Sequence, residues 1–158
     1  MKKIICIFLA VGLSFMSLHA EEKNGYKKQK VVYHINYDDK KQQKGALVNI
    51  QNHINAVGAD NLDLRVVLHG NGLSLLLVPE ALKQLKKFKY ANADDNFAAR
   101  IDTLKGQGVK FDVCENTVIG RNVTIEDDLH DVVHEDIVPS GVAELAKLQM
   151  EGFAYIKP

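Results

Sequence analysis

Residues 108–120, GVKFDVCENTVIG, decide the fold, because they bring a cysteine to the point where a strand gives way to a helix. Apolar residues at positions 109, 111 and 113 alternate with charged ones, which predicts a strand that ends at Cys114. Asn116 and Thr117 are residue types that favour a helix N-cap, and the apolar residues that follow them can dock a first helical turn on a sheet. The sequence therefore predicts a thiol at the carboxyl end of a strand.

This predicted position favours chemistry at Cys114. Open α/β sheets bind their ligands at the carboxyl ends of their strands, and the unpaired amides of a helix start favour a nearby anion. A thiolate is such an anion. The alternative is a buried cysteine that packs as a small hydrophobic residue. On the first interpretation, we expect the thiol to lie in a crevice that solvent or a neighbouring subunit can reach.

The first twenty residues have the pattern of a cleavable secretory signal. Two lysines are followed by an apolar run over residues 4–18 and then by Ala20, a small residue before two glutamates. The run is shorter than the roughly 20 residues that span a bilayer. We therefore expect export to the periplasm, with no stable membrane insertion after cleavage. Residues 21–30 are charged and predict a flexible lead-in to a single domain over residues 31–158.

Charge and cysteine content narrow the classes of function. Without residues 1–20 the chain carries 18 basic and 20 acidic residues, a net charge of about −2, which argues against nucleic acid as a partner. Cys6 lies in the predicted signal, so Cys114 is the single cysteine of the exported chain. Such a cysteine is hidden, paired between chains or kept as a reactive thiol.

The remaining sequence alternates strand and helix patterns. Apolar and alternating runs predict strands at residues 31–35, 62–68, 109–114, 137–138 and 153–156. Helical spacing predicts helices or helical turns near residues 47–57, 73–77, 79–90, 97–104, 117–120 and 142–150. Gln43 is expected off the apolar stripe of the first helix, and Ser140 is the expected N-cap of the last. This order predicts a three-layer α/β/α domain with a mainly parallel five-stranded sheet.

Two more segments are expected at the same sheet edge as Cys114. The strand 62–68 stops at His69-Gly70-Asn71-Gly72, a turn whose backbone amides could face a small ligand or another chain. His34, near the end of the first strand, could point into the same cleft. His69 is a candidate to hold a thiolate or protonate a leaving group, or else an ordinary polar turn residue. With Cys114 as the catalytic residue, the candidate substrate-binding residues are His34, His69, Gly70, Asn71, Gly72, Asn116 and Thr117.

Residues 126–136, EDDLHDVVHED, hold two histidines among acidic residues. His130 and His134 are four apart, which would place them on one face of a helix and make a weak metal site possible. No third ligand follows at a recognised spacing, so the segment also reads as a solvated acidic surface. We assign no metal and no cofactor to the chain.

Three segments together resemble the DsrE/DsrF-like proteins, which have a YchN-like fold. They are HGNGLSLL from residue 69, GVKFDVCENT from residue 108 and VPSGVAELAKLQMEGFAYIKP from residue 138. The resemblance covers about residues 31–158 and implies an α/β sandwich that assembles into homotrimers or hexamers. In the sulfur-relay members a cysteine at a strand end carries a persulfide to or from partner proteins, and the resemblance gives that role to Cys114.

Two classes of function remain open. The first is a periplasmic sulfur carrier or sulfurtransferase that forms a persulfide on Cys114 and docks a sulfur donor or acceptor protein. The second is a non-catalytic homo-oligomeric module that binds a small ligand or a protein, with Cys114 only lining the site. Thiol–disulfide exchange within the chain is excluded, because a single cysteine cannot cycle intramolecularly.

Overall fold

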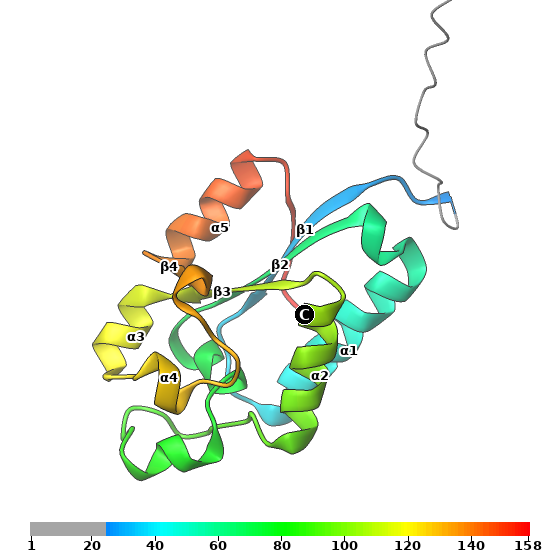
Figure 1. The fold of residues 1–158 in the computed structure, drawn as a ribbon. Coiled ribbons are helices and arrows are strands. Elements are labelled where there is room, and N and C mark those ends of the chain that lie inside the picture. Colours follow the sequence, from blue (N-terminus) through cyan, green and yellow to red (C-terminus); the bar gives the residue numbers. More distant parts are fainter. Residues whose placement is uncertain (1–24) are drawn as a thin grey trace, which may run out of the picture.

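The computed structural model describes residues 25–158, so the predicted signal lies outside the described residues. A five-stranded parallel sheet forms the centre, in the order β4-β3-β2-β1-β5 (Figure 1). Its strands are β1 (Gln29–Ile35), β2 (Leu62–Leu68), β3 (Lys110–Cys114), β4 (Ile137–Val138) and β5 (Ala154–Ile156). The α-helices are α1 (Lys40–Val57), α2 (Asp95–Gly106), α3 (Glu115–Arg121), α4 (Ile125–Asp128) and α5 (Gly141–Met150).

Helices cover both faces of the sheet, which confirms the predicted three-layer α/β/α fold. Figure 1 shows α1 and α2 on one side of the strands and α5 on the other. The larger part of the core lies on the α1 and α2 side, where Leu47 and Ile101 pack against strand residues such as Val66. A smaller cluster joins α5 to the other face: Val32, Val67, Leu145, Leu148 and Phe153. Within residues 25–158, the helices fall short of the length and apolar character that a membrane span requires.

The alternation along each strand sorts its side chains between these two layers. In β1, Val31, Tyr33 and Ile35 belong to the larger core, whereas Val32 belongs to the cluster beneath α5. Because successive side chains point to opposite faces, His34 lies on the α5 face with Val32. The same rule places the even-numbered residues of β3, including Cys114, on the α5 face.

The strand order reverses direction at β1. The chain builds outward from β1 through β2 and β3 to β4, and then returns as β5 on the other side of β1. Ligands of open α/β sheets bind outside the carboxyl ends of the strands at such a switch point. The crevice between β1 and β5 is therefore the place where this topology favours a binding site.

The helix boundaries correct several expectations. The helix α1 begins at Lys40, where Asp39 caps it by accepting a 2.7 Å hydrogen bond from the Gln42 amide. Gln43, expected off the apolar stripe, is fully buried because its amide bonds the Tyr37 carbonyl and the Ser74 hydroxyl.

The predicted helix over residues 79–90 is also shorter than expected. Only Pro79–Lys83 is helical, as a 3₁₀ turn. Beyond it the chain leaves the helical path so that Leu85 and Phe88 are buried, and the Arg121 guanidinium lies over the Phe88 ring at 4.4 Å from its centroid.

Candidate functional site

Cys114 is both the last residue of β3 and the N-cap of α3. The expectation that Asn116 or Thr117 caps this helix is wrong, because α3 begins at Glu115, directly after the cysteine. The thiol is free but only 5% of the residue is exposed, so the single chain leaves little direct access for solvent. Access from a neighbouring subunit stays a prediction.

Gly141, the first residue of α5, brings Cys114 and His69 together. A Cβ placed on this glycine would lie 3.0 Å from the His69 Cβ and 3.3 Å from the Cys114 Cβ. Both distances are at or below the limit of ordinary contact, so a side chain here would push the two residues apart. Ser140 fixes the helix start, since its hydroxyl accepts a 3.4 Å hydrogen bond from the Ala143 amide as predicted.

His69 and His34 are joined directly to each other. Their Nε2 atoms lie 2.7 Å apart, and their rings stack with centroids 4.8 Å apart at 25°. The Nδ1 atom of His34 makes a second 2.7 Å hydrogen bond, to the Tyr155 hydroxyl of β5. The hydrogen bonds thus run from Tyr155 through His34 to His69, across the switch point between β5 and β1.

The surroundings keep both imidazole rings neutral near pH 7. Burial, together with the charges of His69 and Lys157, lowers the pKa of His34 to about 4. Burial and the same Lys157 charge also lower the pKa of His69. A neutral imidazole has one bare nitrogen, so this pair can accept a proton from a neighbouring acid.

Only some residues of the turn after β2 lie near Cys114. The Gly70 amide donates a 2.8 Å hydrogen bond to the Thr117 hydroxyl, which fastens the turn to α3 beside Cys114. Asn71 faces away, since its side-chain oxygen accepts a hydrogen bond from Arg121 at 2.8 Å. Gly72 is buried against the end of β1, where a Cβ would lie 1.9 Å from the Ile35 carbonyl oxygen. Asn116 is exposed.

The turn and α3 residues predicted for substrate binding therefore separate into two groups. Gly70 and Thr117 lie with His34, His69 and Cys114, whereas Asn71, Gly72 and Asn116 take other positions. The structure holds no ligand, so substrate binding by any of them stays a prediction.

A buried charge cluster lies on the same face of the sheet, beneath α5. Asp112 precedes Cys114 by two residues, and one of its carboxylate oxygens lies 3.3 Å from the Arg65 guanidinium. Its other oxygen, Oδ2, is buried without a hydrogen-bond partner. Burial raises the pKa of Asp112 to about 6, which the Arg65 charge opposes and the nearby Glu144 charge reinforces.

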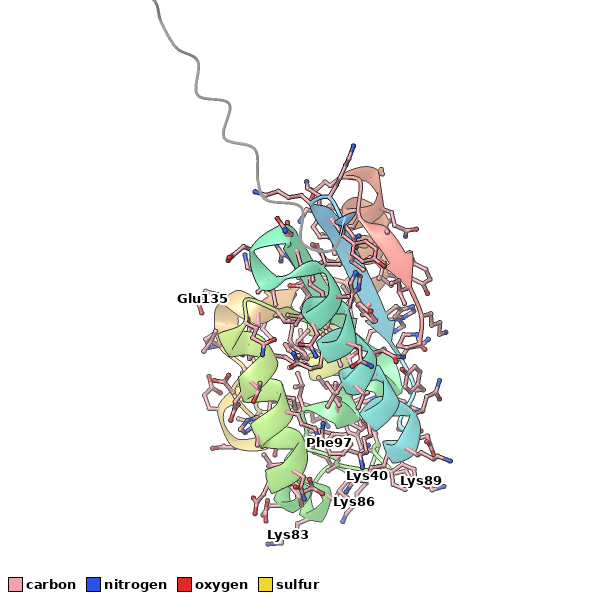
Figure 2. The ribbon with its side chains drawn as sticks, turned by 90° about the vertical axis from the view of Figure 1, so that its right-hand side faces the viewer. Lys40, Lys83, Lys86, Lys89, Phe97 and Glu135 are labelled. Atoms are coloured by element: carbon pink, nitrogen blue, oxygen red, sulfur yellow. The ribbon has the colours of Figure 1, made fainter. Side chains whose placement is uncertain are left out.

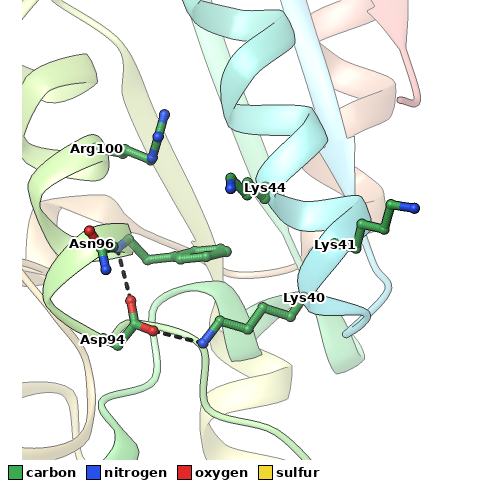
Figure 3. A pocket seen from close by; sticks show the side chains of 7 residues that line it. Lys40, Lys41, Lys44, Asp94, Asn96 and Arg100 are labelled. Carbon is green, nitrogen blue, oxygen red and sulfur yellow. Dashed lines mark hydrogen bonds and ion pairs between the residues drawn. The ribbon is translucent and has the colours of Figure 1, made fainter.

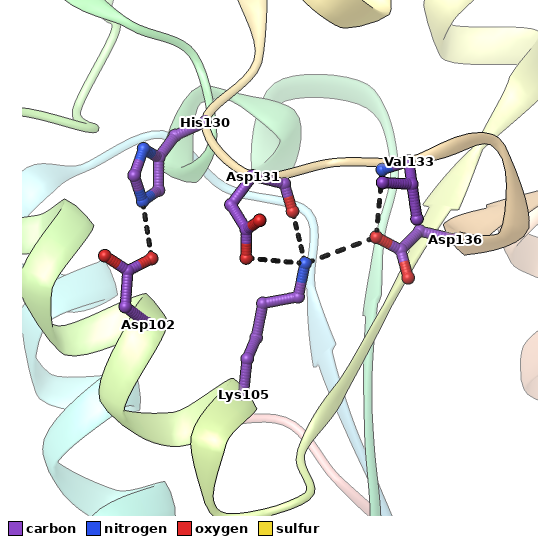
Figure 4. Close-up of polar contacts among 6 residues, drawn as sticks. All are labelled: Asp102, Lys105, His130, Asp131, Val133 and Asp136. Carbon is purple, nitrogen blue, oxygen red and sulfur yellow. Dashed lines mark hydrogen bonds and ion pairs between the residues drawn. The ribbon is translucent and has the colours of Figure 1, made fainter.

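The histidines of the acidic segment do not share a helical face, which corrects that expectation. The helix α4 ends at Asp128, so His130 and His134 are in different local structures. Figure 4 shows His130 turned to Asp102 of α2, and the two side chains lie 2.7 Å apart. His134 instead lies 3.2 Å from Glu126. Lys105 forms ion pairs with Asp131 at 3.1 Å and with Asp136 at 3.3 Å, and these hold the acidic segment against the end of α2. Among residues 25–158, no three metal-ligating side chains gather into a site.

Three residues of the site were missed by the sequence reasoning. Gly141, Tyr155 and Lys157 all come from the last eighteen residues of the chain. A signal for two of them was present, because the period of the final strand puts Tyr155 and Lys157 on one face. The position of β5 next to β1, which brings that face to His34, has no signature in the sequence.

Comparison with known proteins gives one family and several similar structures, two of which follow. Residues 29–158 match the sequence model of the DsrE/DsrF-like family. A structure described as the protein of unknown function MTH1491 from Methanobacterium thermoautotrophicum is 28% identical, with a TM-score of 0.64, over 82% of this chain and 99% of that one. The ychN protein of E. coli is 16% identical with a TM-score of 0.54, over 84% and 100% of the two chains, and shows a similar fold. No curated protein matches the sequence.

Proposed function

Because the chain belongs to the DsrE/DsrF-like family, we propose that it carries sulfur as a persulfide on Cys114. Membership of this family supports a fold related to sulfur relay. The persulfide on Cys114 itself is our proposal. One observation carries it: Cys114 and His69 meet at Gly141, and hydrogen bonds run from His69 to His34 and on to Tyr155.

The proposed transfer needs only this chain and a sulfur donor. The Cys114 thiol passes its proton only transiently to His69, because burial lowers the pKa of that imidazole, and the resulting thiolate attacks the outer sulfur of a polysulfide or protein persulfide. The new S–S bond forms as the S–S bond of the donor breaks. The donor leaves as a thiolate and takes up the proton that the histidines held. Oxidation states balance within the exchange, so the step calls for no cofactor.

The positive charge of Lys157 supports an anionic donor. Its charge acts on both histidines, as their lowered pKa values show, so it lies close enough to attract a polysulfide or thiosulfate anion. The thiol is 5% exposed, so we propose that the start of α5 moves when the donor enters.

Sulfur loading of the purified chain, residues 21–158, tests this function. We expect incubation with polysulfide to add sulfur to the protein by intact mass, and Cys114→Ser to add none. His69→Asn should slow loading at least about a hundredfold, the lower end of the range for a positioned acid or base. His134→Asn is the matched control, because that histidine is exposed and lies apart from the thiol. Absence of added sulfur on the unaltered protein would refute the carrier function.

We also propose that the carrier acts outside the cytoplasm and docks a sulfur donor or acceptor protein. The support is the signal pattern of residues 1–20, and cell fractionation with mass determination of the mature N-terminus tests it. Recovery of the uncleaved chain in the cytoplasm would contradict export.

A homo-oligomeric binding module is the second candidate, and exposed apolar side chains on α5 favour it. Val142, next to the Gly141 that meets Cys114, is 65% exposed, and Met150 at the other end of α5 is 83% exposed. Such side chains are covered when subunits associate. Light scattering tests the assembly: a trimer or hexamer at micromolar concentration supports it, and a monomer removes it. If the oligomer takes up no sulfur, the binding module is the better function.

A further inference from the structure

A basic hollow lies far from the thiol chemistry, between α1 and α2. Its volume is about 540 Å³, within the range of about 300 to 1,000 Å³ that small-molecule pockets occupy. It is lined by Lys40, Lys41 and Lys44 of α1, by the α2 cap residue Asp94, and by Phe97 and Arg100 of α2.

The lining carries an excess of positive charge. Its single carboxylate, Asp94, is already bound by Lys40 at 2.7 Å and by the Phe97 amide at 3.1 Å. The side chains of Lys41, Lys44 and Arg100 form no hydrogen bond or ion pair within residues 25–158. Figure 3 shows Lys44 and Arg100 facing the hollow from opposite helices. Like charges held around one space repel each other unless an anion lies between them.

The first turn of α1 adds to the positive charge of the lining. Its first two positions are Lys40 and Lys41, and the turn itself contains no acidic residue. The helix starts are already capped, α1 by the Asp39 carboxylate and α2 by that of Asp94. A bound anion would therefore offset the charges of the lysine and arginine side chains.

Further lysines lie at the same end of the molecule as the pocket. Figure 2 shows Lys40, Lys83, Lys86 and Lys89 together there, away from Glu135. Asp38 acts on Lys89 and Asp94 pairs with Lys40, so the charge at this end is mixed. The lysines without an acidic partner raise the local concentration of an anionic ligand.

We propose that the pocket between α1 and α2 binds a small organic phosphate. Arg100 offers a planar set of donors that matches phosphate oxygens, Lys44 adds a point charge from the opposite helix, and the excess charge suits a dianion better than a single carboxylate. Phe97, a buried part of the lining, supplies an apolar wall for the organic part.

This pocket is separate from the site at Cys114. Phe97 and Leu47 belong to the larger core on the α1 and α2 face, whereas Cys114 and Gly141 meet on the α5 face. The sheet lies between the two sites, so phosphate binding and sulfur loading are independent properties. Either can fail without the other.

Calorimetric titration of the purified chain with adenosine 5′-monophosphate tests the proposal, with inorganic phosphate as the head group alone and adenosine as the uncharged counterpart. We expect saturable binding of the monophosphate and none of adenosine. Amide NMR shifts should concentrate at residues 40–44 and 94–100. The double variant Lys44→Gln, Arg100→Gln should weaken binding at least about tenfold, because it removes two charge-assisted contacts.

The matched control is Lys83→Gln, Lys86→Gln, which removes the same charge at the same end but outside the pocket. It should change affinity less than about threefold, the share expected from screened, distant charges. Cys114→Ser should bind the monophosphate as the natural chain does. Equal weakening by the pocket and control variants, unsaturable binding, or equal binding of adenosine would each overturn the proposal.

Discussion

The Nε2 atoms of His34 and His69 lie 2.7 Å apart, so only one proton can lie between the two rings. If His34 donates at this contact, its Nδ1 accepts from the Tyr155 hydroxyl; if His69 donates, the direction of both hydrogen bonds reverses. The pair therefore titrates as a unit. Its ability to switch direction is what suits it to take and return the proton of a nearby thiol.

Removing the positive charge of Lys157 should make this pair easier to protonate. Lys157 lowers the pKa of both histidines, after the larger effect of burial. We therefore expect Lys157→Gln to raise both apparent pKa values, while the pair still titrates below the ordinary value of about 6.5, because burial is unchanged. Imidazole ¹⁵N NMR across pH 3 to 8 measures this. Unchanged titration would show that Lys157 does not act on the pair.

A methyl group at Gly141 should impair the site at little cost to the rest of the fold. The added Cβ of Gly141→Ala would meet His69 at 3.0 Å and Cys114 at 3.3 Å. We expect slower reaction of the thiol with sulfur donors, by about tenfold, since small displacements of reacting groups have effects of this order or larger. Gly120→Ala is the control, because its Cβ meets nothing within 4 Å, and alanine in a helix should add about 0.5 to 1 kcal/mol of stability. Equal reaction rates for the two variants would contradict this role of Gly141.

The close approach of Gly72 to β1 should make that glycine essential for folding. A Cβ there would lie 1.9 Å from the Ile35 carbonyl oxygen, so the turn and the strand would have to separate. We expect Gly72→Ala to lower the free energy of unfolding by more than about 3 kcal/mol, the range of severe core disruption. Gly45→Ala, in open space on α1, should raise it by about 0.5 to 1 kcal/mol. Urea unfolding of both variants measures these free energies. A small loss of unfolding free energy in Gly72→Ala would contradict the described packing.

Replacing Gln43 with an apolar residue of similar size should lower the free energy of unfolding. Its amide donates to the Tyr37 carbonyl at 2.7 Å and to the Ser74 hydroxyl at 2.9 Å, and its oxygen accepts from Asn92 at 2.8 Å. Gln43→Leu leaves the buried Asn92 without this partner, so we expect a loss of about 2 to 4 kcal/mol in unfolding free energy. The exposed neighbour, changed as Gln42→Ala, should stay within about 0.5 kcal/mol. A small loss at position 43 would mean that water replaces the network.

The pH dependence of stability should reflect two opposing groups. The pKa of Asp112 is raised to about 6, so its stabilising effect is present at low pH and is lost as the pH rises through about 6. The pKa of His34 is lowered to about 4, so its effect is present above about 6.5 and is lost as the pH falls toward 4. The two slopes have opposite signs over the same range of pH.

Removing Asp112 should therefore expose the histidine contribution. We expect the unfolding free energy of Asp112→Asn to rise more steeply between pH 4 and 6.5 than that of the unaltered chain, by about 2 kcal/mol over the range. Arg65, Glu144 and Asp136 act on this carboxyl, and the change leaves them in place. Urea titrations at several pH values measure the slope, and parallel curves would contradict the raised pKa.

The sequence by itself determined the order of elements and several of their boundaries. Alternation placed one strand at residues 62–68 and a short one at residues 137–138, both as the structure has them. It also ended a strand at Cys114 and made Ser140 the cap of the last helix. These features depend on residues within a few positions of each other, and local periodicity and capping chemistry record such relations directly.

Only the tertiary structure decided which residues surround the thiol and which polar groups are buried. Tyr155 reaches His34 across 121 positions of sequence because β5 pairs beside β1, and Gly141 fits between His69 and Cys114 because α5 crosses that edge of the sheet. Gln43 is buried because partners from distant loops complete its hydrogen bonds. Such contacts depend on how strands pair and layers pack, and a single sequence carries no local pattern for either.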